Sequence, residues 1–415
     1  MTTEIAVMNK SGISLAADSA VTIGRGNKFY NTANKLFTLS KYHPVGIMVY
    51  SNAEFMGYPI ETVIKEYRKR LRDTAFDTLC DYWDDFVKYL EDNFHNHNGM
   101  DDFKWKIISF INSLDNDIRE NTNKEINEYY ESTNNDDEST EQKQIKMLEI
   151  AAQCVKKAIF DIHREYSSLD NDDSFYNDFE LIKNTIKEEV QEITEQIIGE
   201  INENEQEKVL DVCTMILTKK HSNGPRTGIV IAGFGEMDMF PKLISGEFMG
   251  VYFSKLKYNE EHNREIDTNH DAAIIPFAQA DVIATFMTGI DQELKSGILD
   301  TIDEYKLHTC EDKSCIEKLK QDVNNIIDLW SKEYHVNPIV ETVGIAPKEE
   351  LARMTETLVN LTSFRRNLSM DDYSQSVGGP IDVALITKGD GFIWIKRKHY
   401  FDMNKNQHFI ENYFK

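Results

Sequence analysis

A threonine follows the initiator methionine, and a threonine in this place can act as a nucleophile. Removal of Met1 would leave Thr2 with both a side-chain hydroxyl and a free α-amine. An α-amine has a pKa of about 7.7 to 8.0, so it can accept the hydroxyl proton near neutral pH without a histidine. Such a residue carries its own nucleophile and base, which suits attack on an amide carbonyl. Thr3 has the same side chain, so the spacing to other residues must decide between the two.

The other polar clusters do not predict a metal or cofactor site. His95 and His97 lie in a polar stretch without a third ligand, and Cys310 and Cys315 lie on an expected helix without matching histidines. The five cysteines are odd in number and include no CxxC pair, which favours free thiols over disulfides. The sequence has no P-loop and no GxGxxG stretch. We therefore expect no cofactor and no metal.

Length and charge limit the classes of function. The 415 residues are enough for two or three domains, and 40% hydrophobic residues suffice for a sizeable core. The 46 basic and 71 acidic residues give a net charge of −25, which repels phosphate backbones and anionic lipid. No apolar run is long enough to span a membrane, and the segment MTTEIAVMNK lacks the features of a signal peptide. We expect a cytoplasmic protein with no nucleic-acid or membrane partner.

An acidic helical block follows the first 60 residues and extends just past the middle of the chain. Residues 61–220 contain no proline and only two glycines, which favours helix. This stretch has 20 basic and 38 acidic residues, a net charge of −18. Apolar residues recur every three or four positions from Ile145 to Ile162 and from Ile182 to Ile197, as in amphipathic helices. We interpret the block as a bundle that packs on itself, with binding of a specific partner as the alternative.

Outside this block the apolar pattern shortens toward a period of two. At the start of the chain, the runs EIAVM and ISLAADSAVT flank a turn at 9–12, and LFTL precedes VGIMVY, so two strand pairs are expected. A helix should follow Pro59. Beyond the block, GIVIAGFG, KLISGEF and GVYFSKLKY predict three further strands.

The last third of the chain mixes helices with a final hairpin. Helices are expected from Pro276 and from Pro347, with an acidic helical stretch at 291–340 between them. IDVALIT and GFIWIKR then predict the hairpin. Two stacked sheets with helices on their outer faces satisfy this order of elements.

Several short stretches together resemble a known family. They are the Thr2-Thr3 pair at a strand start, the LAADS run ending in Asp18 and Ser19, Lys35 before the next strand, the strand GIMVYSNAE, and SVGGP before the last hairpin. This set resembles the proteasome β-subunit family of amino-terminal nucleophile (Ntn) hydrolases, as a bacterial-type relative with a large helical insertion. The resemblance covers pieces of 2–70, 226–290 and 341–400.

The resemblance implies roles for individual residues. Asp18 lies sixteen positions after Thr2, the offset that the family has from its nucleophile, and this selects Thr2 over Thr3. Lys35 would lower the pKa of the threonine hydroxyl, and Asp18 would keep that lysine charged; a purely structural ion pair is the alternative. The oxyanion donor would be the backbone N–H of Tyr50 or, with a slip of one residue, of Ser51.

A further pair of residues is implied near the threonine amine, but the match leaves two choices. Asp371 with Ser374 fits the family's Asp-x-x-Ser spacing, whereas Asp372 with Ser376 better fits the distance to the following glycines.

The sequence also departs from the family at one site position. The family's serine at the entry to the middle helix is missing, where this chain has Phe277-Ala278-Gln279-Ala280-Asp281. Gln279 or Asp281 could substitute for it, or Asp281 could be an ordinary first-turn acid.

These observations lead to one predicted fold and function. We expect an α+β fold, a four-layer αββα sandwich of residues 2–60 and 226–400, with an acidic all-helical insertion at 61–225 and a shorter one at 291–340. The expected function is a threonine-type peptidase or amidohydrolase acting on peptide or protein substrates from a homo-oligomeric, proteasome-like complex. An unfoldase or regulatory protein could serve as its partner. The alternative is a catalytically silent structural or regulatory subunit whose acidic insertion binds a partner.

Overall fold

The protein folds as α+β with antiparallel sheets. The computed structural model describes residues 3–23, 28–94, 99–132, 139–220, 226–309, 313–368, 378–399, 401–408 and 411. Two compact units share the chain. Unit 1 comprises Met1–Val87, Thr227–Glu247 and Glu260–Lys415, and unit 2 comprises Lys88–Arg226 and Phe248–Asn259.

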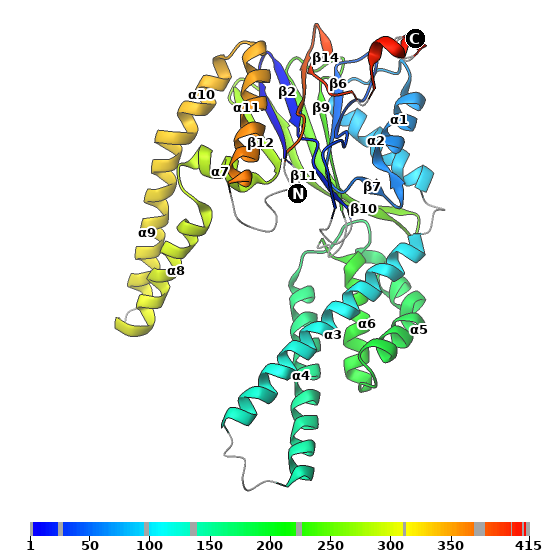
Figure 1. Ribbon diagram of the computed structural model, residues 1–415, viewed down its shortest axis with the longest axis vertical. Helices are drawn as coiled ribbons and strands as arrows, with labels where there is room; N and C mark the ends of the chain where they lie inside the picture. The colour runs from blue at the N-terminus through cyan, green and yellow to red at the C-terminus, as the bar shows by residue number, and fades with distance from the viewer. Residues whose placement is uncertain are drawn as a thin grey trace. The chain divides into compact units, whose positions relative to one another are not determined.

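The first five-stranded sheet joins the two ends of the chain (Figure 1). Its strand order is β12 (Ala272–Ala278), β1 (Glu4–Asn9), β2 (Gly12–Ala17), β13 (Asp382–Thr387) and β14 (Gly391–Lys396). All four neighbouring pairs are antiparallel. The predicted hairpin of β1 and β2 is confirmed, with Asn9 paired to Gly12 at its turn. The predicted carboxy-terminal hairpin of β13 and β14 is confirmed as well.

The second five-stranded sheet places the early strands beside those that follow the acidic block. Its order is β11 (Lys255–Glu265), β10 (Lys242–Tyr252), β9 (Thr227–Gly233), β6 (Val45–Ser51) and β5 (Leu36–Thr38). The pairs of β6 with β5 and with β9 are antiparallel. Two short ribbons, β3 (Val21–Ile23) with β4 (Lys28–Tyr30) and β7 (Glu54–Phe55) with β8 (Tyr58–Pro59), lie outside these sheets.

The strand period of two decides which side chains enter the core between the sheets. In β1, Ala6 and Met8 pack in one cluster with Met48 of β6 and Val230 of β9. Because alternate side chains of a strand share a face, Glu4 belongs to the same face of β1 as Ala6 and Met8. A charged residue at the start of this strand is therefore directed toward the side on which the second sheet packs.

The opposite face of the first sheet packs against helices. Ile5 and Val7 of β1 cluster with Leu351 and Val359. The helices concerned are α7 (Ala280–Thr288), α10 (Asn337–Ile345) and α11 (Lys348–Asn367), while α8 (Gln292–Thr309) and α9 (Lys313–Ser331) form a hairpin between α7 and α10. Pro347 is the N-cap of α11, as the sequence indicates.

Two further helices of unit 1 follow the early strands. Pro59 is the N-cap of α1 (Ile60–Leu71), which confirms the predicted helix start. Its buried face comprises Val63, Ile64 and Tyr67, and the Tyr67 hydroxyl donates to Asp85 Oδ2 at 2.9 Å in α2 (Leu79–Phe94). α2 carries the chain across the boundary from unit 1 to unit 2.

The helices of unit 2 confirm the predicted helical character of the acidic block. They are α3 (Gly99–Ser132), α4 (Thr140–Ser168), α5 (Phe179–Ile197) and α6 (Glu203–Thr218). Capping boxes begin α4, at Ser139 with Gln142, and α6, at Asn202 with Glu205.

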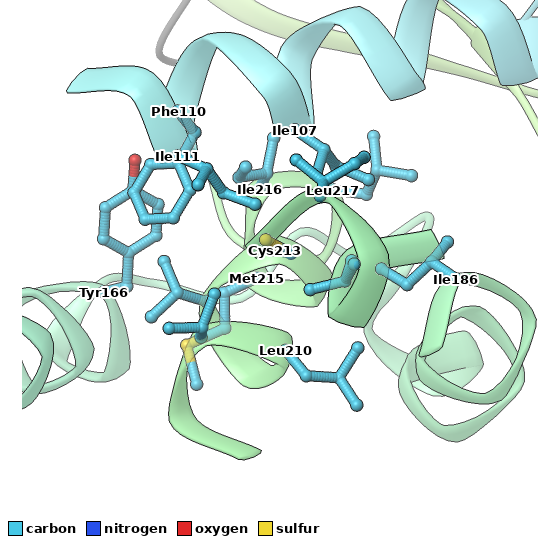
Figure 2. Close-up of a cluster of buried hydrophobic side chains, with 14 of the residues drawn as sticks. Ile107, Phe110, Ile111, Tyr166, Ile186, Leu210, Cys213, Met215, Ile216 and Leu217 are labelled. Carbon is cyan, nitrogen blue, oxygen red and sulfur yellow. The ribbon is translucent and has the colours of Figure 1, made fainter. Parts of the chain in front are cut away.

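Unit 2 has a hydrophobic core of its own. Figure 2 shows Cys213 of α6 surrounded by apolar side chains that include Ile107, Ile186 and Leu217. Burial raises the pKa of the Cys213 thiol, so this cysteine is an inert core residue. Not all of the predicted apolar faces are covered, since Ile145 and Leu148 at the start of α4 are exposed.

One predicted helix start is wrong. Pro276 lies inside strand β12, and helix α7 begins at Ala280, after Gln279 in the left-handed region at φ 55°. β12 is an edge strand, so a proline can lack its N–H there without losing a ladder bond to a second neighbour. In the part of the chain that is described, no helix combines the length and the apolar character needed to cross a bilayer.

Candidate active site

Asp18 is the centre of a buried polar cluster in unit 1. It follows β2 directly and is fully buried. Its Oδ1 accepts a hydrogen bond from Thr3 N at 3.2 Å, and its Oδ2 accepts one from Gly378 N at 2.9 Å. Its own N–H donates to Thr3 O at 3.1 Å. One carboxylate thus ties the residue after Thr2 to the glycine pair that precedes the last hairpin.

Lys35 supplies the positive charge of the cluster. It lies immediately before β5, and only 6% of the residue is exposed. Its ammonium donates to Asp18 Oδ1. Its carbonyl accepts from Val49 N at 2.8 Å, which fixes the lysine backbone to β6. Because a buried ammonium is strongly unfavourable without a countercharge, the pairing explains how Lys35 is accommodated. Asp18 and Lys35, which are 17 residues apart in the sequence, are therefore in direct contact.

Glu4 is a third charged member that the sequence analysis missed. Its carboxylate is fully buried, and Oε1 lies 3.2 Å from Lys35 Nζ. The strand pattern carries a signal for it: Glu4 is an acid on a face of β1 otherwise occupied by Ala6 and Met8. The pairing of β1 with β12 has a bulge at this point, and its extra residue, Phe277, belongs to β12, so the alternation of side chains along β1 is kept.

Several predicted site residues lie outside the described residues. These are Thr2, Asp371, Asp372, Ser374 and Ser376. Their roles stay predictions.

The described neighbours of those residues meet at the cluster. Thr3 and Gly378 both bond to Asp18. The glycine pair is required by its backbone: Gly379 has φ 82°, and a Cβ there would come within 2.8 Å of the Asn31 side chain.

Tyr50 and Ser51, the two predicted oxyanion donors, end strand β6. The Tyr50 ring packs in the core between the sheets, and its hydroxyl donates to Oε2 of the exposed Glu261 at 2.7 Å. Only its backbone is a candidate for a role at the site. Ser51 is exposed and has φ 66°, in the left-handed region that non-glycine residues rarely occupy. Such strain is frequent where a backbone group must be aimed at a ligand.

A small pocket of about 30 Å³ opens beside Lys35. Backbone or side chains of both candidate oxyanion donors line it, so the lysine and the strand end border the same space. Most of the wall is apolar. The lining residues are Val21, Ala33, Asn34, Lys35, Val49, Tyr50, Ser51, Asn52, Ala53 and Ile60.

Asp281 has a partner of its own. Both of its carboxylate oxygens accept from Arg366 Nη2 at 2.6 Å, on the exposed surface between α7 and α11. The ion pair with Arg366 is a structural role for Asp281 that does not involve Thr2. Gln279, the other suggested substitute, is the N-cap of α7.

The residues considered for metal binding are outside the described structure or unsupported by it. His95, His97 and Cys310 are not described, nor is the side chain of Cys315. Within the described ranges, no group of three or more His, Cys, Asp or Glu side chains is placed to hold a metal ion.

Comparison with known proteins gives only distant structural similarities. No family model matches the chain, and no curated protein matches it. Among solved structures, Anbu (ancestral beta-subunit) from Yersinia bercovieri is 9% identical, with a TM-score of 0.31, over 99% of this chain and 94% of that one. The helical assembly of the Anbu complex from Pseudomonas aeruginosa is 9% identical, with a TM-score of 0.33, over 99% and 93%. Anbu from Hyphomicrobium sp. strain MC1 is 10% identical, with a TM-score of 0.29, over 98% and 93%.

These results correct the family assignment made from the sequence. Membership of the proteasome β-subunit-like Ntn hydrolases is not supported, because no family model matches and the TM-scores are near 0.3. The assignment rested on short strand stretches, such as the one ending in Asp18. Alternating apolar residues around a turn satisfy any antiparallel hairpin, so these stretches are not specific to one family.

Proposed function

We propose that this protein hydrolyses amide or peptide bonds, with Thr2 as nucleophile once Met1 has been removed. The observation that carries the proposal is the buried bond between Lys35 and Asp18, whose carboxylate also binds the backbone of Thr3. This arrangement fixes a cation next to the segment that begins with the candidate nucleophile.

The proposed reaction uses the threonine twice. The Thr2 hydroxyl oxygen attacks the carbonyl carbon while its α-amine accepts the hydroxyl proton and passes it to the leaving amine. Lys35 stabilises the developing negative charge on the hydroxyl oxygen, and the N–H of Tyr50 or Ser51 stabilises the oxyanion. Water then attacks the resulting ester, which releases the carboxylic acid and restores the threonine hydroxyl.

The proposal extends to the architecture and the substrate. Helices α1 and α2 beside the second sheet would complete a four-layer αββα sandwich with the helices that cover the first sheet. The substrate would be a peptide or protein that places a small side chain in the pocket beside Lys35, and the working form would be a homo-oligomer. Asp372 and Ser376 would lie near the threonine amine.

The test is covalent labelling of the purified, untagged protein. Intact mass is measured before and after treatment with an epoxyketone, which reacts with a hydroxyl and an adjacent free amine. We expect a mass without Met1 and a single adduct located on Thr2 by peptide mapping. Thr2→Ser keeps both reacting groups and should still be labelled, whereas Thr2→Ala should not.

A matched control separates the nucleophile from its neighbour. Thr3→Ser keeps the backbone N–H that bonds to Asp18 and should be labelled like the wild type. Labelling of Thr2→Ala, or a wild-type protein that retains Met1 and forms no adduct, would refute the threonine mechanism and favour a catalytically silent subunit.

A further inference from the structure

We propose that Glu4 is a positioning residue of this site, which holds the Lys35 ammonium together with Asp18. The inference rests on the proposed function and adds a residue to it. Two carboxylates from separate strand ends, one at the start of β1 and one just after β2, contact a single Nζ.

Burial makes this contact consequential. The side chains of Glu4 and Asp18 are fully buried, and that of Lys35 is 7% exposed. Water therefore screens these charges little, and their interactions are stronger than those of surface ion pairs. A buried carboxylate requires a partner, and the Lys35 ammonium is in contact with Glu4.

The geometry of the lysine explains why one carboxylate would not suffice. A lysine side chain has several rotatable bonds, and its ammonium is a point charge with three donors rather than a rigid fork. A single bond to Asp18 fixes the distance of Nζ from that oxygen but leaves the ammonium free to swing about it. A second contact from Glu4, on another strand, limits that motion and keeps the charge at one location.

The charges of the two carboxylates act on the same ammonium. When Glu4, Asp18 and Lys35 are ionised, both carboxylates attract the Lys35 Nζ from different strand ends. Glu4 therefore adds to the attraction that keeps the lysine charge in this place.

The strand pattern explains how the chain directs Glu4 to this place. Glu4, Ala6 and Met8 share the face of β1 that meets the second sheet, and Lys35 precedes β5 of that sheet. A shift of the β1 register by one residue would instead direct Glu4 toward the helices on the opposite face. The pairing of Glu4 with Ala17 in β2 holds that register beside Asp18.

The experiment compares Glu4→Gln with the wild-type protein on a fluorogenic peptide amide and in the rate of epoxyketone labelling. We expect kcat and the labelling rate to fall roughly 10- to 100-fold, the usual effect of removing a group that orients a functional one, with KM nearly unchanged. Circular dichroism and the unfolding midpoint establish that the variant is folded.

The matched control removes a buried carboxylate that also pairs with a lysine but is remote from the site. Asp238 is buried, lies 3.0 Å from Lys242 Nζ and accepts bonds from Leu79 N and Gly235 N. Asp238→Asn should lower the unfolding midpoint and leave kcat unchanged. A merely structural role of Glu4 would give the same result for Glu4→Gln.

A second variant covers the case in which Glu4→Gln does not fold. Glu4→Asp keeps the buried charge but withdraws it from Lys35 Nζ by one methylene, so we expect a smaller fall in kcat. Wild-type kcat in folded Glu4→Gln, or in Glu4→Asp where Glu4→Gln does not fold, would overturn the inference. The parallel Thr2→Ala variant distinguishes the two failures: if it retains activity or labelling, the proposed function itself is wrong, and this inference falls with it.

Discussion

At the scale of single residues, the Asp18 carboxylate combines three tasks that most carboxylates do separately. It balances the charge of Lys35, accepts the backbone N–H of Thr3 and accepts that of Gly378. Asp18→Asn removes the negative charge while nearly preserving the shape. We expect a loss of about 3 kcal/mol in the free energy of unfolding, because one partner of a buried ion pair is removed. We also expect kcat to fall by roughly 10²-fold or more, which is the usual effect of removing one group that stabilises the transition state electrostatically.

Urea unfolding and amide-substrate kinetics measure both effects. The comparison variant is Glu149→Gln in α4, which breaks an exposed pair with Lys146 and should change the free energy of unfolding by less than about 0.5 kcal/mol. If Asp18→Asn unfolds like the wild type and retains its kcat, Asp18 has neither role.

At the scale of elements, the end of strand β6 is held in an uncommon conformation at Ser51. A β-branched side chain is poorly tolerated at a positive φ, so Ser51→Val should destabilise the strand end by about 1–3 kcal/mol or force the backbone into another conformation. In the second case the neighbouring N–H groups turn away from the pocket beside Lys35, and kcat falls. Ser51→Gly, which accepts φ 66° without strain, should retain wild-type kinetics. Equal kinetics in both variants, with unchanged stability, would show that the conformation at Ser51 is not needed.

Local patterns in the sequence predict the elements better than the contacts between them. The turn after Asn9, the proline before α1 and the three-to-four spacing in the acidic block are short-range signals, and each corresponds to an element of the structure. The helix predicted to start at Pro276 is wrong, because proline occurs both at helix starts and in edge strands. The sequence does not show which strand will lie at the edge of a sheet.

The candidate site depends on contacts between elements, and this limits its prediction. Asp18 and Lys35 are predicted from the resemblance to a known family, Asp18 by its offset from Thr2 and Lys35 by its place before a strand. Glu4 was not found, because its contact with Lys35 depends on the packing of one sheet on the other. The same limit applies to the apolar face from Ile145 to Ile162. The spacing predicts an amphipathic helix, but it does not show which of its apolar residues other elements will cover, and Ile145 is exposed.

At the scale of the whole molecule, each of the two units has a hydrophobic core made of its own residues. The core of unit 2 comprises side chains of its helices and of the segment Phe248–Asn259, and the cores around β1 comprise residues of unit 1 alone. Within unit 2, Lys257 anchors that segment: its ammonium donates to Asp172 Oδ2 at 2.9 Å and to the carbonyls of Leu217 and Lys219, both at 2.7 Å. Separate cores allow separate cooperative unfolding, so two thermal transitions are expected.

The variant Leu217→Ala tests this expectation, because Leu217 is fully buried in the core of unit 2. Its truncation should cost about 2–5 kcal/mol. In scanning calorimetry, one transition should move down by several degrees, by about 2–4 °C per kcal/mol for a unit of this size, while the other stays in place. The control is Leu181→Ala on α5. Leu181 is 61% exposed, so neither transition should move. A single transition that shifts as a whole in Leu217→Ala would mean that the two units unfold together, and that the acidic helices stabilise the sheets which hold Asp18 and Lys35.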